Sequence, residues 1–134
     1  MKFSTKIRYG IRAMIEIGSD TTPSNGVFQK DIAKNQNLSV KYLDHIISSL
    51  KASGLITTVR GRKSGYILTR PASEISMLDI HNAFENGICV IDCLDINFKC
   101  ENDGVCKSQE FWKGLNVIVL DYFKATTLKD LIDR

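Results

Sequence analysis

The sequence predicts a mainly α-helical protein with one small β-hairpin. Apolar residues recur at helical spacing over most of the chain, and two β-prone runs near its middle are joined by a short, glycine-flanked connection. The longest helical pattern comes near the end of the chain. With 134 residues, of which 43% are hydrophobic and 25% charged, the composition is that of one globular domain, with or without an oligomerisation element.

The first helix is expected to begin at Ser4 and to end before the turn-forming residues 21–26. Its apolar positions recur every three or four residues, as on a helix with one buried face. They are Ile7, Ile11, Met14, Ile15 and Gly18. A second, short helix fits residues 29–35. Gln36 and Asn37 then form a tight break, because asparagine tolerates left-handed backbone better than most residues.

A third helix is expected after Ser39, whose hydroxyl suits an N-cap, and Gly54 is placed to end it. The apolar stripe of this helix consists of Val40, Leu43, Ile46, Ile47 and Leu50. Two β-prone runs follow, at residues 55–60 and 66–69. Together they predict a β-hairpin with a basic tip.

The second half of the chain contains one short and one long helical pattern. A capping box at residues 76–79 is expected to open a short helix that ends near Gly87. After an aperiodic segment, a long helix is predicted over residues 108–124, with a last short helix from Thr127. Four apolar residues of the long helix alternate at steps of four and three, the spacing of a coiled-coil seam. They are Phe111, Leu115, Ile118 and Tyr122, and we expect them to form a dimer seam.

Charge divides the chain at about the same place as the helical pattern. Residues 1–70 carry twelve Lys or Arg against four Asp or Glu, whereas residues 71–134 carry six against eleven. Such an asymmetry indicates that one half is built to bind a polyanion. We therefore expect a DNA-binding domain over residues 1–71. Residues 72–134 would hold the cysteine-bearing segment, the dimerisation helix and the short C-terminal helix.

The order of elements in the first half is that of a winged helix-turn-helix, followed by the long dimerisation helix. A recognition helix must bury one face and offer polar side chains to base edges from the other. The third helix meets this requirement on a face that carries Lys41, Asp44, His45 and Ser48. The hairpin adds three cations, Arg60, Arg62 and Lys63. Because clustered cations suit phosphate neutralisation or a narrow minor groove, the sequence predicts binding to double-stranded DNA.

Seven segments carry a resemblance that covers essentially the whole chain. They are STKIRYGIRA at 4–13, DIA at 31–33, LSVKYL at 38–43, LKASGLI at 50–56, VRG at 59–61, GYIL at 65–68 and TLKDL at 127–131. In these segments the chain resembles the family of bacterial transcription regulators that includes IscR, NsrR, RirA and CymR. The resemblance implies a homodimer whose recognition helix meets DNA through Ser39, Tyr42, Asp44 and His45. It also implies that Arg60 enters the minor groove.

The sequence offers little support for membrane association or catalysis. No apolar run approaches the roughly 20 residues that cross a bilayer, and the first residues lack the apolar core of a secretory signal. We expect a cytoplasmic protein. There is no glycine fingerprint for nucleotides, no nucleophile–base constellation and no pair of carboxylates placed for acid–base work, so we expect no enzyme.

All four cysteines lie in one short segment, at Cys89, Cys93, Cys100 and Cys106. A disulfide framework does not suit a cytosolic chain of this size, and the spacing contains only one near-match to a zinc pair. Spacing alone leaves metal binding and inert thiols equally open, although thiolates on an irregular segment suit an iron–sulfur cluster. The resemblance implies that Cys93, Cys100 and Cys106 hold such a cluster, [2Fe–2S] or [4Fe–4S], with Cys89 as an additional candidate.

The chain departs from the cluster-binding relatives at the fourth ligand. Residues 107–109 include no histidine, and the first-helix positions hold Arg8 and Arg12, neither of which ligates iron.

We expect a repressor on a palindromic operator that senses iron, redox state or nitric oxide through the cluster. The alternative is a cluster-free regulator of the same fold, controlled by cysteine thiol chemistry or by a regulatory protein partner.

Overall fold

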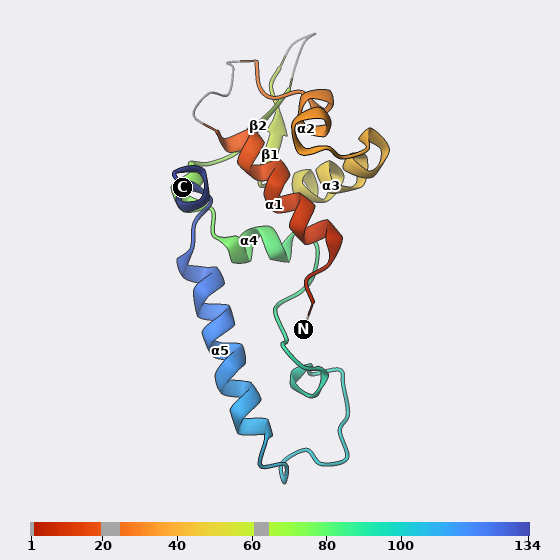
Figure 1. Ribbon diagram of the computed structural model, residues 1–134, viewed down its shortest axis with the longest axis vertical. Helices are drawn as coiled ribbons and strands as arrows, with labels where there is room; N and C mark the ends of the chain where they lie inside the picture. The colour runs from red at the N-terminus through yellow and green to blue at the C-terminus, as the bar shows by residue number, and fades with distance from the viewer. Residues whose placement is uncertain (1, 20–24, 61–64) are drawn as a thin grey trace.

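The computed structural model describes residues 2–19, 25–60 and 65–134, and its elements follow the expected order (Figure 1). The helices are α1 (Thr5–Gly18), α2 (Gln29–Gln36), α3 (Val40–Ala52), α4 (Met77–Asn82), α5 (Gln109–Ala125) and α6 (Leu128–Ile132). The strands β1 (Ile56–Thr58) and β2 (Tyr66–Leu68) pair antiparallel, with Ile56 opposite Leu68. Two 3₁₀ turns cover Ala72–Glu74 and Asp92–Leu94. The mainly helical fold with one β-hairpin is confirmed.

Hydrogen bonds from side chains begin four of these helices where the sequence predicts them. The hydroxyl of Ser4 accepts from the Ile7 amide, and that of Ser39 accepts from the Tyr42 amide. Ser76 and Thr127 each form a capping box with the aspartate three residues later. Each cap satisfies an amide that has no partner within its helix.

The tight break between α2 and α3 is confirmed at Asn37. This residue has a φ of 55° in the left-handed region, and its amide donates to carbonyls at the end of α2. Asparagine adopts this conformation more readily than other non-glycine residues. The break turns the chain so that α3 packs across α2, as in a helix-turn-helix.

Buried side chains from both halves of the chain form one core. Its members with little or no exposed surface include Met14, Ile17, Ile32, Leu43, Ile46, Leu50, Ile75, Ile80 and Leu128. The expected boundary after residue 71 lies between β2 and the first 3₁₀ turn, and the core continues across it. Figure 1 shows α6 beside α1, whereas α5 projects away from the rest of the body. None of the helices in the described ranges is long and apolar enough to cross a membrane.

Two expected apolar stripes differ from the structure in detail. On α1, Ile17 is buried, whereas Ile11 and Ile15 are half-buried. On α3, Val40 is 52% exposed although Leu43 is fully buried. Val40 lies in the first helical turn, at the edge of the stripe, where none of the elements in the described ranges covers it fully.

The hairpin is shorter than expected and is supported by the segment before α2. The amide of Val27 donates to the Tyr66 carbonyl at 3.0 Å, and the amide of Tyr66 donates to the Val27 carbonyl at 2.8 Å. Gly26, with a φ of +82°, lies against Gly65 so closely that a Cβ at Gly65 would be 2.6 Å from the Gly26 carbonyl carbon. Glycine is required at this crossing because any side chain would force the two backbones apart.

We expect Leu43→Ala to lower the free energy of unfolding by roughly 2–5 kcal/mol, because it leaves a cavity in a close-packed core. The matched control is Val40→Ala in the same helix, which should change it by less than about 0.5 kcal/mol, since Val40 is exposed. Urea unfolding followed by circular dichroism, at one protein concentration, measures both. Equal losses at the two positions would contradict this burial pattern.

Candidate functional site

The exposed face of α3 carries the side chains that the sequence assigns to DNA. Lys41, Asp44, His45 and Ser48 are all exposed, on the side away from the buried residues of the helix. Ser39 is exposed at the N-cap. Tyr42 is half-buried, since its ring packs edge-on against Tyr9 with the centroids 5.6 Å apart. The structure therefore brings the predicted recognition residues together on one surface.

The start of α1 lies beside the start of α3. Between them is an open hollow of about 490 Å³, lined by Thr5, Tyr9, Asn37, Leu38, Ser39 and Tyr42. The guanidinium groups of Arg8 and Arg12 lie 5.9 Å and 5.2 Å from the centre of the Tyr9 ring. This surface adds hydroxyl groups and a cation beside the recognition face.

Sequence patterns missed two polar networks around α2. Arg12 donates to the Gln36 side chain and carbonyl, and Gln36 donates in turn to Glu16 at 2.7 Å. Arg12 is therefore held within the fold. Gln29 donates to the Val40 carbonyl and to the Asp44 carboxylate. No periodicity marks such pairs, because they join residues 11 to 24 positions apart.

Of the three cations predicted in the hairpin, Arg60 is exposed just beyond β1. Arg62 and Lys63 lie outside the described residues. The structure therefore describes one of these three cations, and it lies next to the first strand of the hairpin.

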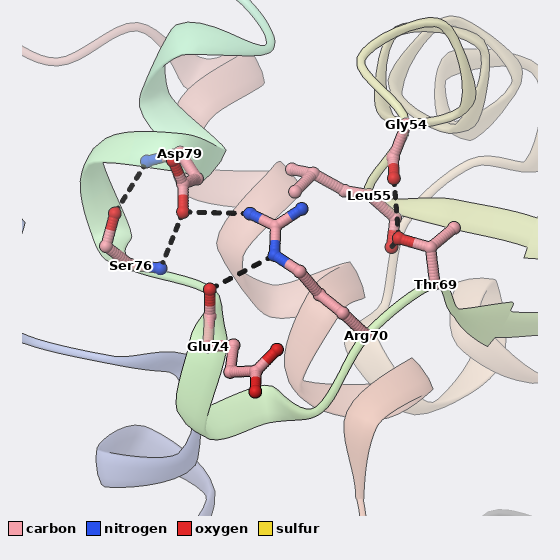
Figure 2. A network of polar contacts seen from close by, with 7 residues as sticks. All are labelled: Gly54, Leu55, Thr69, Arg70, Glu74, Ser76 and Asp79. Carbon is pink, nitrogen blue, oxygen red and sulfur yellow. Dashed lines mark hydrogen bonds and ion pairs between the residues drawn. The ribbon is translucent and has the colours of Figure 1, made fainter.

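A polar network ties the return strand of the hairpin to α4 (Figure 2). The hydroxyl of Thr69 donates to the Gly54 carbonyl at 2.6 Å, just beyond α3. The next residue, Arg70, donates to the Glu74 carbonyl at 3.1 Å and forms an ion pair with Asp79 at 3.0 Å. The same Asp79 carboxylate accepts the Ser76 amide in the capping box of α4. The base of the hairpin is thus joined to both α3 and α4.

The four cysteines are free thiols on a segment with little regular structure. Cys89 is exposed, and Cys93, Cys100 and Cys106 are half-buried. Their thiol chemistry fits an iron–sulfur cluster. Their arrangement does not yet form a site, since no three Cys, His, Asp or Glu side chains gather as a metal-binding group within residues 2–19, 25–60 and 65–134.

Two of the thiols have shifted acidity. The Sγ of Cys106 lies 3.0 Å from the Ser108 hydroxyl, just before α5, and this contact lowers the pKa of the Cys106 thiol. Nearby backbone amides at Ser108 and Gln109 lower it further. Partial desolvation and the negative charge of Asp95 raise the pKa of Cys89.

One side of α5 leaves apolar side chains uncovered. Phe111, Ile118 and Tyr122, three residues of the predicted seam, are 66%, 66% and 61% exposed, and Leu115 is half-buried. On an adjacent side, near the end of α5, Phe123 stacks on Phe3 with the ring centroids 5.3 Å apart. The seam residues therefore share an accessible face.

The chain is similar to known transcription regulators along almost its whole length. A family model described as "Rrf2: Iron-dependent Transcriptional regulator" matches residues 3–134. Protein rrf2 of Nitratidesulfovibrio vulgaris is 33% identical over 132 residues, covering 98% of this chain and 87% of the relative. The regulator IscR of Klebsiella pneumoniae is 28% identical over 136 residues, covering 100% of this chain and 81% of the relative.

Solved structures of two transcription regulators are also similar to this chain along almost its whole length. CymR, described as the global cysteine regulator of B. subtilis, superposes with a TM-score of 0.83 at 31% identity, covering 99% of this chain and 97% of that one. IscR of T. potens superposes with a TM-score of 0.75 at 30% identity, covering 99% of this chain and 87% of that one. These similarities confirm the expected type of fold and the resemblance stated above.

In protein freed of iron, we expect Cys106 to be alkylated faster than Cys89 by iodoacetamide at neutral pH, although Cys89 is the more exposed. The thiolate is the nucleophile, and a lowered pKa leaves more thiolate at a given pH below both pKa values. The difference should shrink as the pH rises above both. Mass spectrometry of the labelled peptides over time measures the rates.

The control for this experiment is Ser108→Ala, which removes the hydrogen bond to Cys106. It should slow labelling of Cys106 and leave the rate at Cys89 unchanged. Faster labelling of Cys89 in the unaltered protein would contradict the assigned shifts.

Proposed function

The chain belongs to the Rrf2 family of transcription regulators, which are not enzymes, and on this basis we propose that it is a repressor that binds a palindromic operator as a homodimer. One observation carries the DNA-binding proposal. Helix α3 is buried along one side and exposes a polar side that begins at its N-cap. Recognition helices of helix-turn-helix proteins lie in the major groove in this way.

The proposed contacts divide by chemistry. The cations Lys41 and Arg60 would neutralise phosphates or, for Arg60, enter a narrow minor groove. Asp44 and His45 offer hydrogen bonds to base edges. The hydroxyl groups of Ser39, Tyr42 and Ser48 can donate hydrogen bonds to phosphate oxygens. Arg62 and Lys63 belong to the same proposal, outside the described residues.

We expect Arg60→Ala to weaken binding to the operator and to make the dependence of log Kd on log salt concentration less steep by about two, because the dimer loses one phosphate contact from each protomer. The operator is first selected from a random duplex library with the unaltered protein. Fluorescence anisotropy at several salt concentrations then measures the slope.

The matched control for Arg60 is Lys113→Ala, which removes one positive charge from α5, away from α3 (Figure 1). Its slope should equal that of the unaltered protein. If the two variants change the slope equally, the effect is net charge and Arg60 does not contact DNA.

The exposed apolar face of α5 supports the dimer. Gly114 lies beside Phe111 and Ile118 on this face, and a Cβ added there would meet no atom of the described residues within 4 Å. Glycine in a helix interior costs about 1 kcal/mol relative to alanine, and no contact within the described residues requires glycine at this position. We propose that a second α5 approaches at Gly114 and covers Phe111, Leu115, Ile118 and Tyr122. A twofold dimer repeats α3 at a fixed spacing, which requires a palindromic site.

We expect Ile118→Asp to convert the dimer to monomers at micromolar concentration, because it places a charge in the centre of the apolar face. The control is Val117→Asp, one residue earlier, which is 55% exposed but lies on the side of α5 that carries Lys113 and Asp121. Sedimentation velocity measures both. Dimers that survive Ile118→Asp would place the interface elsewhere.

For sensing, we propose that Cys93, Cys100 and Cys106 hold an iron–sulfur cluster whose state sets the affinity for the operator. The support is the donor set and the iron-dependent description of the matching family. A second candidate is thiol chemistry without a cluster. It is favoured by the acidic thiol of Cys106 and by thiols that are not gathered in the described residues, and one structural relative is described as a cysteine regulator. A regulatory protein partner remains part of this second candidate.

We expect protein purified without oxygen to contain iron and sulfide in equal amounts and to absorb visible light. Replacing Cys93, Cys100 or Cys106 by Ala should abolish both. Loss of both in Cys89→Ala as well would make Cys89 the fourth ligand. Protein that remains free of iron after reconstitution, yet binds its operator, would leave thiol chemistry as the sensing mechanism.

A further inference from the structure

A side chain of α2 forms hydrogen bonds to the recognition face of α3, and the DNA-binding proposal above assigns no role to these bonds. Gln29, the first residue of α2, donates from Nε2 to the Val40 carbonyl at 3.1 Å and to Asp44 Oδ1 at 2.5 Å. We propose that Gln29 is a specificity-determining residue, because it fixes the Asp44 carboxylate in the orientation that recognises one base pair. This inference rests on the proposed contact between α3 and DNA.

The two hydrogen bonds determine how the Gln29 amide is oriented. A glutamine amide has two N–H donors on its nitrogen and only lone pairs on its oxygen. Val40 and Asp44 both present acceptors, so the nitrogen must face α3 and both of its protons are used. The Val40 carbonyl is also the helical acceptor one turn before Asp44. Gln29 therefore binds the backbone and the side chain of the same turn.

The Asp44 carboxylate has few other constraints. It is exposed, and no salt bridge to it occurs in the part of the chain that the structure describes. An exposed aspartate on a helix populates several rotamers, and only one of them directs an oxygen to a given base. Because Gln29 holds Oδ1, the second oxygen, Oδ2, is left to accept from DNA in a fixed direction.

The chemistry of a fixed carboxylate selects a base. Ionised carboxylates only accept hydrogen bonds, and the usual partner of Asp or Glu in the major groove is the N4 amine of cytosine. Guanine and thymine present acceptors at the same edge, so a carboxylate held there repels them, and adenine places its N7 acceptor beside its N6 amine. Fixing the group in advance strengthens binding to the correct base, because no rotamer entropy is lost on binding, and it makes a wrong base more costly, because the carboxylate is held in place. A movable carboxylate could instead turn away from a wrong base.

A purely structural role for Gln29 predicts a different outcome. Helices α2 and α3 already share the core through Ile32, Ala33 and Leu43, all of which are buried. If Gln29 only joined the helices, its loss would weaken binding to every sequence alike. If it positions Asp44, its loss changes the preference at one base pair. The profile over single base-pair substitutions therefore separates the two roles.

The experiment measures binding to the selected operator and to each of its single base-pair variants. We expect Gln29→Ala to reduce the preference for C·G at one position of each half-site by about fivefold, the lower end of what one good base contact provides. Asp44→Ala should reduce the preference at that same position. The double variant should lose no more than Asp44→Ala alone, because the two residues act through one contact. Gln29→Glu keeps the length of the side chain but puts a second carboxylate beside Asp44. It should reduce the preference for C·G more than Gln29→Ala does, because the two negative charges repel each other.

The matched control is Gln36→Ala, the same change at the other end of α2, where the side chain binds Arg12 and Glu16 and not α3. It should leave the base preferences unchanged. The inference is overturned if Gln29→Ala and Gln29→Glu keep the preferences of the unaltered protein or lower affinity evenly at all positions. It is also overturned if Asp44→Ala changes no position. An unaltered protein that selects no sequence overturns the proposed function together with this inference.

Discussion

Burial of α1 is the constraint on which the rest of the structure depends. This helix contacts α2, α3, α4, α6 and β2, and its residues Ala13, Met14 and Ile17 are almost completely buried. Burying a side chain the size of methionine or isoleucine contributes roughly 1.5–3 kcal/mol, several times the value of a surface ion pair. Because one helix packs against the helix-turn-helix, the hairpin and the C-terminal helix, their relative positions are fixed by a single hydrophobic core. The recognition face of α3 therefore has a fixed orientation relative to α4 and α6, the helices on either side of α5 in the sequence.

The polar contacts between the two halves refine this arrangement rather than create it. The side chains of Arg70 and Asp79 are 36% and 42% exposed, and a pair with this much solvent contributes at most about 1 kcal/mol. Its position matters more than its energy, because Asp79 also closes the capping box of α4 and Arg70 follows the strand β2. The aromatic contact of Phe123 with His81 links α5 to α4 directly.

Local signals in the sequence were sufficient for most element boundaries. Caps such as Ser39 and the capping box at Ser76 act within four residues, and so does the left-handed break at Asn37. The burial of individual residues was harder to predict, as Val40 and Ile17 show, because it depends on which neighbouring element covers each turn. The support of the hairpin by Val27 was also missed, since the pairing joins residues 39 positions apart with no shared pattern. The polar face of α3 could be predicted because it is the complement of a periodic apolar stripe.

The sequence by itself determined the order and type of the elements, the family, the polar face of α3 and the apolar face of α5. These features depend on periodicity and on caps, which act between residues a few positions apart. Only the tertiary structure decided that both halves share one core, that Arg12 is held by Gln36, and that Gln29 contacts Asp44. It also decided that the cysteines of the described segment are not gathered and that Ser108 makes Cys106 more acidic. Such contacts join single polar atoms at short range, and their partners are set by the packing of the whole chain rather than by any repeating pattern in it.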